Sequence, residues 1–230
     1  MNGILYGIGV GPGDPELMTL KAVRLINENE IIAVPGKTPE ETVAYKIAIQ
    51  AVPTLAKKKL LPIYMPMTHD KEEMRKNHAE GALHIEEYLK TGKNVVFLTL
   101  GDPTIYSTFS YIQKIVDSNG YKTELVSGIP SFCAAAARIN ISLAEWNEPL
   151  HIIPAVHNCD NNLNKEGNYI LMKTGSHMKR VKDMLVKSGK SVCMAENCGM
   201  ENEHIYLNAE DIPEDAGYYS LIIAKEKPER

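Results

Sequence analysis

The sequence predicts an α/β protein of two domains, with a parallel sheet in the N-terminal domain and a mixed sheet in the C-terminal domain. Three observations support this prediction. Apolar runs alternate with helical patterns in the first half, apolar runs follow one another with one clear helix in the second half, and 44% of the 230 residues are hydrophobic. Alternating strands and helices favour a parallel sheet, whereas consecutive strands favour antiparallel pairing. This apolar content suffices for a globular core.

Five strands and five helices are expected in the first half. The predicted strands are Ile4–Val10, Ile31–Val34, Leu60–Met65, Val95–Leu100 and Thr123–Ser127. The predicted helices are Pro15–Asn29, Glu40–Ala51, Lys71–Thr91, Pro103–Asn119 and Ser131–Ile139. Short apolar runs bounded by turn residues are typical of the buried strands of a parallel sheet.

The second half is expected to be a mixed-sheet domain. Its predicted strands are Leu150–Pro154, Tyr169–Lys173, Ser191–Glu196, His204–Asn208 and Tyr218–Lys225, and its helix is His177–Ser188. The polar segment Asn158–Gly167 is predicted to be an exposed loop. The change in pattern puts the domain boundary between Gly128 and Glu148, and we assign residues 1–130 and 131–230 to the two domains.

The net charge and the distribution of apolar residues argue against nucleic-acid binding and against membrane insertion. The formal net charge is -4, which gives no general attraction to nucleic acid or to an anionic membrane. The N-terminus lacks a basic region followed by an apolar one, and no apolar run approaches the roughly 20 residues that span a bilayer. We therefore expect a cytoplasmic protein with no membrane segment and no nucleic-acid partner.

The four cysteines follow no disulfide pattern, which suits a reducing compartment. Zinc binding is the alternative role of the cysteines. Cys193 and Cys198 lie farther apart than a CxxC pair, and His151, His157 and His204 show no matching ligand spacing. We expect no metal site.

Two strand-to-helix turns contain the tripeptide Gly-Asp-Pro. The first closes the glycine-rich run Gly7–Pro15, and the second lies within Leu98–Thr108. In each, the Asp is expected to cap a helix whose first residue is the Pro. Since both follow strands of one parallel sheet, we expect them at its carboxyl edge, where ligands of open α/β folds bind.

A dinucleotide-binding fold is the obvious alternative for a glycine-rich first turn. The GxGxxG fingerprint fails, because the last position is Pro12 when counted from Gly7 and Asp14 when counted from Gly9. The second strand also ends Ala33-Val34-Pro35, without the acidic residue that would bind a ribose. Both failures disfavour a nicotinamide oxidoreductase.

Three separated motifs resemble those of the tetrapyrrole methylase family, the class III S-adenosylmethionine-dependent methyltransferases. They are Gly9–Thr19, Leu100–Pro103 and Ser127–Ser131. Gly101–Thr108 and Ser131–Arg138, followed by Leu143–Glu145 and Leu150–Ala155, most resemble the branch that methylates C20 of precorrin-2 or cobalt-factor II in cobalamin biosynthesis. The resemblance extends from Ile4 to about Lys225.

The resemblance implies the two-domain class III methyltransferase fold, with S-adenosylmethionine in the cleft between the domains and S-adenosylhomocysteine as the product. It also implies the cofactor contacts. By position these are Pro12, Leu100, Gly101, Asp102, Thr104, Ile105, Pro130, Ser131, Met172 and Asn197. Phe132 stands where many relatives carry a small residue. For Met172, a plain buried strand residue is the alternative.

The substrate implied by the resemblance is a tetrapyrrole with several carboxylates, so cations are expected beside it. Candidate substrate contacts are Gly11, Arg24, Arg138 and Lys173. No catalytic base is identified. Asp102 and Lys173 are the candidates, and a helix cap is the alternative role of Asp102.

Three alternatives stay open at this stage. The chain resembles a family whose other branches methylate a different ring carbon or a non-tetrapyrrole acceptor, and a tetrapyrrole carrier without catalysis is a non-enzymatic possibility. Cobalt-containing and metal-free substrates are not separated by any residue. The resemblance further implies a homodimer.

Overall fold

The computed structural model describes residues 1–66, 68, 70–154, 163 and 165–227. The chain divides into two compact units, Met1–Pro130 and Ser131–Arg230. Each unit contains one sheet of five strands.

The sheet of the N-terminal unit is wholly parallel, as predicted, with strand order β3-β2-β4-β1-β5. Its strands are β1 (Ile4–Gly9), β2 (Ile31–Pro35), β3 (Lys59–Ile63), β4 (Val95–Thr99) and β5 (Lys122–Val126). The helices are α1 (Leu20–Glu28), α2 (Val43–Ala51), α3 (Lys71–Leu89) and α4 (Phe109–Ser118), with 3-10 turns η1 (Pro15–Leu17), η2 (Pro39–Glu41) and η3 (Pro53–Lys57).

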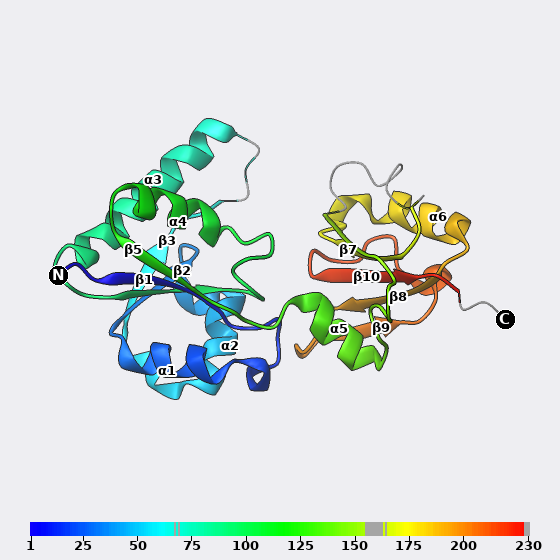
Figure 1. The fold of residues 1–230 in the computed structure, drawn as a ribbon, viewed down its shortest axis with the longest axis horizontal. Helices are drawn as coiled ribbons and strands as arrows, with labels where there is room; N and C mark the ends of the chain where they lie inside the picture. Colours follow the sequence, from blue (N-terminus) through cyan, green and yellow to red (C-terminus); the bar gives the residue numbers. More distant parts are fainter. Residues whose placement is uncertain (67, 69, 155–162, 164, 228–230) are drawn as a thin grey trace. The chain divides into compact units, whose positions relative to one another are not determined.

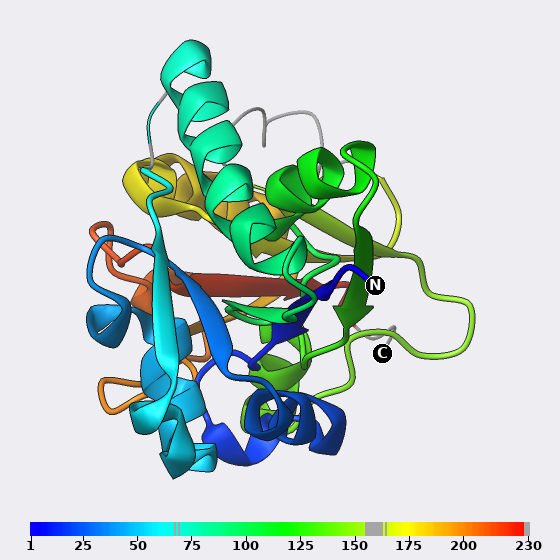
Figure 2. The same ribbon diagram turned by 90° about the vertical axis from the view of Figure 1, so that its left-hand side faces the viewer.

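Helices cover both faces of this sheet. In Figures 1 and 2, α1 and α2 lie on one face and α3 and α4 on the other. Side chains alternate along β4, so Val96 and Leu98 join the core under α1 and α2, while Val95 and Phe97 join the core under α3 and α4. A strand buried on both faces must be apolar throughout, which explains the continuous apolar run in the sequence.

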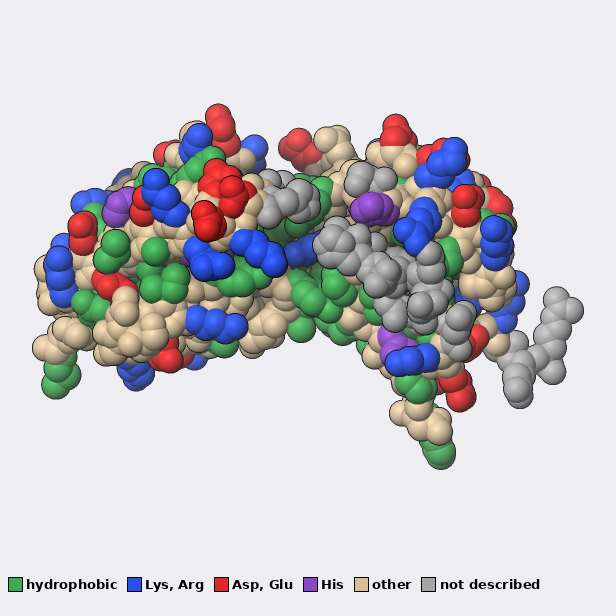
Figure 3. Space-filling model, turned by 90° about the horizontal axis from the view of Figure 1, so that it is seen from above, with side chains coloured by type: hydrophobic (Ala, Val, Ile, Leu, Met, Phe, Trp, Pro, Cys, Tyr) green, Lys and Arg blue, Asp and Glu red, His purple; other side chains and the backbone are tan. Residues whose placement is uncertain are grey.

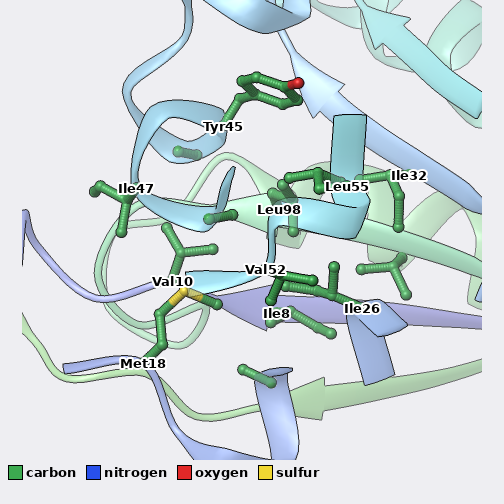
Figure 4. Close-up of a cluster of buried hydrophobic side chains, with 14 of the residues drawn as sticks. Ile8, Val10, Met18, Ile26, Ile32, Tyr45, Ile47, Val52, Leu55 and Leu98 are labelled. Atoms are coloured by element: carbon green, nitrogen blue, oxygen red, sulfur yellow. The ribbon is translucent and has the colours of Figure 1, made fainter. Parts of the chain in front are cut away.

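The core under α1 and α2 is drawn in Figure 4, where Ile8 and Leu98 meet Ile26, Val52 and Leu55. All five are at most 1% exposed. Burying one aliphatic side chain of this kind contributes about 1.5–3 kcal/mol to the stability of the folded state. This packing fixes the carboxyl ends of β1 and β4 relative to each other.

The outer surface of the N-terminal unit carries both signs of charge. Figure 3 shows Lys and Arg side chains interspersed with Asp and Glu side chains over the face that carries α3 and α4. On α3 itself, the Lys76 ammonium and the Glu80 carboxylate are 4.0 Å apart, one helical turn from each other. An exposed pair of this kind stabilises a helix only slightly.

The C-terminal unit has the predicted mixed sheet, in the order β6-β7-β10-β8-β9. Its strands are β6 (Leu150–Pro154), β7 (Asn168–Met172), β8 (Ser191–Glu196), β9 (His204–Tyr206) and β10 (Ser220–Lys225). Only β6 and β7 pair in parallel among these neighbours. Within this unit α6 (Met178–Ser188) lies on one face of the sheet and α5 (Ser131–Ile139) on the other (Figure 1), with 3-10 turns η4 (Gly175–His177) and η5 (Ala209–Asp211).

Three helix starts in the prediction are wrong. The helix predicted from Glu40 begins at Val43, because Pro39–Glu41 form the separate turn η2. Asp14 caps only η1, and α1 begins after Thr19, whose hydroxyl accepts from the Ala22 amide. The predicted helix at Pro103 begins at Phe109 instead, so Asp102 is not an α-helix cap. An Asp-Pro pair is compatible with a single turn as well as with a helix start, and the side-chain bonds at each site select the turn.

Part of the predicted loop Asn158–Gly167, namely residues 158–162 and 164, lies outside the described residues, as do His157 and Cys159. Over the described chain, no helix combines the length and the apolar character needed to cross a membrane. In the same residues no three His, Cys, Asp or Glu side chains gather in a way that could hold a metal ion.

Candidate functional site

Two loops of the N-terminal unit join where the parallel strands end. β1 and β4 are adjacent, so their carboxyl ends, Gly9 and Thr99, lie at one edge of the sheet. Beyond the edge, the Val10 amide donates to the Thr99 carbonyl at 3.0 Å. Gly11 and Gly101 exchange backbone hydrogen bonds, with N···O distances of 3.3 and 2.8 Å. The predicted position of both Gly-Asp-Pro turns at the carboxyl edge is therefore confirmed.

Three glycines, Gly9, Gly101 and Gly128, allow the backbones to meet at this edge, and we call them the glycine junction. A Cβ on Gly9 would lie 2.4 Å from the Gly101 carbonyl oxygen, and a Cβ on Gly128 would lie 2.2 Å from the same oxygen. These are backbone contacts that no rotamer change can relieve. Gly101 also has a φ of +69°, a conformation that costs other residues free energy.

The carboxylate of Asp102 connects the glycine junction to the adjacent loop segments through hydrogen bonds. This carboxylate is buried, and one oxygen accepts hydrogen bonds from the Thr104 amide at 2.8 Å and from the Thr104 hydroxyl. The other oxygen accepts from the Gly128 amide at 3.0 Å. Both oxygens are thus engaged within the protein, which favours a structural role and leaves Asp102 weakly suited to act as a base.

The remaining predicted contacts of the N-terminal unit surround this junction. Gly11 and Pro12 are buried in the first loop, whereas Leu100 is half-buried against the core under α1 and α2. In the second loop Thr104 is exposed and Ile105 half-buried. Pro130, also half-buried, ends the segment that follows β5. These positions therefore cluster on three loops that the sheet brings together.

Two of the predicted cofactor contacts of the C-terminal unit, Met172 and Asn197, lie at one sheet edge, whereas Ser131 begins α5. Met172 ends β7 and Asn197 follows β8, and both strands flank the start of β10. The Asn197 amide donates to the Tyr219 carbonyl at 3.1 Å. Lys173 and Asn197 have left-handed backbones, with φ of +58° and +51°, which turn the chain sharply away from the sheet. Burial lowers the pKa of the Lys173 ammonium below its ordinary value.

Thr174 has an unused polar group beside this second edge. It is fully buried, and its hydroxyl is one of two buried side-chain groups with no hydrogen-bond partner among the residues that the structure describes. A buried hydroxyl without a partner destabilises the fold by about 1–3 kcal/mol.

The two candidate arginines lie on helices rather than at these sheet edges. Arg24 is on α1, where its guanidinium pairs with Glu28 at 2.7 Å and both side chains are mostly exposed. Arg138 is in the last turn of α5, which Ser131 begins, and its Nε lies 2.6 Å from a carboxylate oxygen of Glu203. The structure thus gives both arginines protein partners. It does not bring Arg24 to the glycine junction.

Comparison with known proteins assigns the family. The model of the tetrapyrrole (corrin/porphyrin) methylases matches residues 4–213. The chain belongs to this family. The resemblance to this family, which three sequence motifs indicated, is confirmed. The alternative interpretation as a nicotinamide oxidoreductase is rejected.

Individual relatives of this tetrapyrrole methylase cover nearly its whole length. A probable cobalt-precorrin-2 C(20)-methyltransferase of Methanocaldococcus jannaschii is 34% identical over 96% of this chain and 95% of its own. A precorrin-2 C(20)-methyltransferase of Sinorhizobium sp is 25% identical, with 98% of both chains covered. Among solved structures, the uroporphyrin-III C-methyltransferase of Thermus thermophilus complexed with S-adenosylhomocysteine has the same fold, with a TM-score of 0.70 and 19% identity over 97% of this chain and 98% of that one.

Three features of the methylase's loops were not found from the sequence. Gly128 lies within the motif Ser127–Ser131, but its contact with Gly101 joins loops that follow two different strands, which the sequence does not reveal. Tyr106 has a left-handed backbone that no local pattern indicates. Glu203, which fixes the turn after Asn197, gave no signal because an isolated Glu is usually a solvated surface residue.

Glu203 holds the turn between β8 and β9 to α5. One carboxylate oxygen accepts from the Gly199 amide at 2.7 Å, and the other pairs with Arg138. The Glu203 side chain is 14% exposed, so these bonds are partly shielded from water. Burial opposes ionisation of Glu203, but the bonds from Gly199 and Arg138 outweigh it and keep its pKa below the ordinary value.

We expect Glu203→Gln to lower the free energy of unfolding by about 1–2 kcal/mol at neutral pH, because a charge-assisted bond and an ion pair are weakened. A carboxylate with a depressed folded-state pKa stabilises the protein above its unfolded-state pKa, and that contribution disappears as the pH falls through the folded-state value. Urea unfolding at pH 7 and at a series of acidic pH values measures this. The difference between wild type and variant should shrink on the acid side.

Glu201→Gln is the matched control, since Glu201 is exposed on the same turn. It should change the unfolding free energy by less than about 0.5 kcal/mol at every pH. The structural role given to Glu203 would be contradicted if both variants lost the same free energy of unfolding, or if the effect of Glu203→Gln did not depend on pH.

Proposed function

We propose that this methylase transfers a methyl group from S-adenosylmethionine to C20 of precorrin-2 or its cobalt form, as a step of cobalamin biosynthesis. The observation that carries the proposal is the 34% identity, over nearly the full length of both chains, to the M. jannaschii protein named for that reaction. The glycine junction supports it, because closely approaching backbones at a carboxyl edge suit a ligand bound through main-chain groups.

The proposed cofactor contacts fall into two groups. In the N-terminal unit they are Pro12, Leu100, Gly101, Asp102, Thr104, Ile105 and Pro130; in the C-terminal unit they are Ser131, Met172 and Asn197. When bound, S-adenosylmethionine supplies a methyl group on a sulfonium that is already a strong electrophile. The protein therefore has to orient the reactants, and good orientation lowers a barrier by up to roughly 7–11 kcal/mol.

For the substrate we propose contacts by Gly11, Arg24, Arg138 and Lys173. A tetrapyrrole of this class bears several carboxylates, which an ammonium or a guanidinium binds through charge-assisted hydrogen bonds. Lys173 is the better placed of the cations, since it directly follows Met172 at the end of β7. Only the neutral amine of Lys173, which would not bind a carboxylate in this way, could accept the proton that C20 loses after methylation; burial, which lowers the pKa of Lys173, favours that form.

Ligand binding and product mass test the proposal together. S-adenosylhomocysteine should raise the melting temperature, whereas NAD and NADP should not. Incubation of the enzyme with S-adenosylmethionine and either precorrin-2 or cobalt-precorrin-2 should increase the mass of the tetrapyrrole by one methyl group. Methylation of other tetrapyrroles or of a non-tetrapyrrole acceptor, with neither of these two substrates modified, would place the protein in another branch of the family.

We further propose that the protein is a cytoplasmic homodimer. The support is its resemblance to the family. Size-exclusion chromatography with light scattering gives the mass directly: about twice the 25.5 kDa of one chain is expected, and a monomer at micromolar concentration would contradict the proposal.

A further inference from the structure

A lysine and a tyrosine meet at the carboxyl edge of the N-terminal sheet. β2 and β3 pair in parallel up to their last residues, Pro35 and Ile63. The chain continues from these residues as Gly36-Lys37 and as Tyr64. The Lys37 ammonium lies over the Tyr64 ring, 4.4 Å from its centroid. A cation this close to the face of an aromatic ring is attracted by the ring, so each side chain holds the other in place.

This lysine and tyrosine follow strands of the same edge as the glycine junction. β2 is the neighbour of β4 in the sheet, and Ala33 lies opposite Phe97. Two residues farther along, at Pro35 and Thr99, both strands end. Adjacent strands are about 4.8 Å apart. The segment that carries Lys37 and the loop after β4 therefore leave the sheet side by side.

The backbone around Lys37 is held on both sides. Before it, the Gly36 amide donates to the Ile63 carbonyl at 2.8 Å, and a Cβ on Gly36 would lie only 2.8 Å from Cγ2 of Thr42. After it, Pro39 is buried, and its carbonyl accepts from the Thr42 hydroxyl at 2.7 Å. The Lys37 side chain therefore extends from a fixed backbone towards solvent.

The Tyr64 ring positions the Lys37 ammonium without neutralising its charge. Both side chains are exposed, that of Tyr64 to 41%. Across the part of the chain that the structure describes, no carboxylate pairs with this ammonium, whereas the guanidinium groups of Arg24 and Arg138 each pair with a glutamate. An ammonium has three N–H donors, and a ring on one side leaves donors for an anion on the other. Lys37 is thus a charged group prepared for a ligand.

We propose that Lys37, positioned by Tyr64, binds a carboxylate of the tetrapyrrole substrate. This inference rests on the proposed function, because that function supplies a ligand with several carboxylates. An ammonium and a carboxylate form charge-assisted hydrogen bonds, which are stronger than those between neutral groups. Tyr64 is a positioning residue: it restricts the lysine before the substrate arrives and so reduces the side-chain entropy that is lost on binding.

Two substitutions of Lys37 test the charge. Lys37→Met removes it from a side chain of similar length and should raise the KM for the tetrapyrrole about tenfold, with kcat kept within twofold. Lys37→Arg keeps the charge and should stay within threefold of the wild-type KM. Since salt screens exposed charges, the ratio of the Lys37→Met KM to the wild-type KM should shrink at about 0.5 M salt. The affinity for S-adenosylhomocysteine should stay within twofold in both variants.

The matched control is Lys59→Met, because Lys59 forms the same kind of pair at the opposite edge of the sheet. Lys59 begins β3, and its ammonium lies 4.8 Å from the centroid of the Tyr88 ring. This variant removes an equal charge and should leave the KM unchanged. An equal rise of the KM in Lys37→Met and Lys59→Met would mean that only the overall charge matters, and it would overturn the inference.

A double-substitution cycle tests the role of Tyr64. Tyr64→Phe keeps the ring and should keep the KM. Tyr64→Leu removes the ring and should raise the KM about threefold, because the ammonium is less restricted. If Tyr64 acts through Lys37, adding Tyr64→Leu to Lys37→Met should raise the KM no further. A Tyr64→Leu effect of the same size in the Lys37→Met background would overturn the positioning role.

The outcomes distinguish this inference from the proposed function. If the wild type methylates the tetrapyrrole and Lys37→Met keeps its KM, the inference is wrong and the function stands. A fall in S-adenosylhomocysteine affinity in Lys37→Met as large as the rise in KM would assign the lysine to the cofactor and also overturn the inference. If the wild type does not turn over, equilibrium titration of cobalt-precorrin-2 by absorbance decides: weaker binding by Lys37→Met than by Lys59→Met supports the inference, and equal binding or no binding overturns it.

Discussion

Gly128→Ala should be strongly destabilising, lowering the free energy of unfolding by at least about 3 kcal/mol. The added Cβ would lie 2.2 Å from the Gly101 carbonyl oxygen and 2.8 Å from the Gly9 backbone. Relief requires the loops after β1, β4 and β5 to separate. Affinity for S-adenosylhomocysteine, measured by calorimetry on whatever variant folds, should fall in parallel.

Gly101→Ala and Gly120→Ala are the controls. Both glycines have left-handed backbones, with φ of +69° and +84°, but a Cβ on Gly101 meets nothing closer than 4.0 Å and a Cβ on Gly120 meets nothing within 4 Å. Each should lower the unfolding free energy by only about 1–2 kcal/mol. Urea unfolding followed by circular dichroism orders the three variants. If Gly128→Ala is no worse than Gly120→Ala, the close packing at the junction is not what the structure indicates.

Asp102→Asn should lower the free energy of unfolding by about 2–3 kcal/mol, although the side chain keeps its shape. Each carboxylate oxygen of Asp102 faces hydrogen-bond donors, from Thr104 on one side and from the Gly128 amide on the other. An asparagine has only one oxygen, so its NH₂ group must face a donor in either orientation. Thermal and urea unfolding measure this loss of stability, and the rate of methyl transfer should also decrease.

Asp14→Asn is the matched control in the other Gly-Asp-Pro turn. There the carboxylate accepts from a single amide, that of Glu16, and an asparagine oxygen can do the same. The change should be below about 0.5 kcal/mol, since Asn and Asp are equally good at this position. A stable Asp102→Asn variant with kcat reduced a hundredfold would instead make Asp102 the base.

The architecture could be predicted because it follows from patterns that repeat along the chain. The strand Val95–Thr99 is buried along its whole length and therefore requires helices on both faces, and its flanking helices were recognisable by the same reasoning. Helix starts were less predictable. Asp102 and Pro103 read as a helix start, but the bonds from Asp102 to Gly128 and from Thr99 to Ser107 hold the segment in an irregular loop that delays α4 until Phe109.

The candidate site was predictable only where a motif is contiguous. The Gly-Asp-Pro turns were visible, and their position at one edge followed from the parallel sheet. The glycine junction was not, because it joins residues from three separate loops. The left-handed backbone of Tyr106 was not visible either, since no local pattern indicates it. Arg138 was chosen for its charge alone, and its partner Glu203 depends on how α5 packs in the C-terminal unit.

The position of the transferred carbon tests most directly whether this methylase acts at C20. S-adenosylmethionine labelled with ¹³C in its methyl group is incubated with the enzyme and, separately, with precorrin-2 and cobalt-precorrin-2, and the product is examined by ¹³C NMR. One labelled methyl group, bonded to C20, is expected in the product of at least one substrate. Label at any other ring carbon, or no transfer to either substrate by a protein that binds S-adenosylhomocysteine, would contradict it.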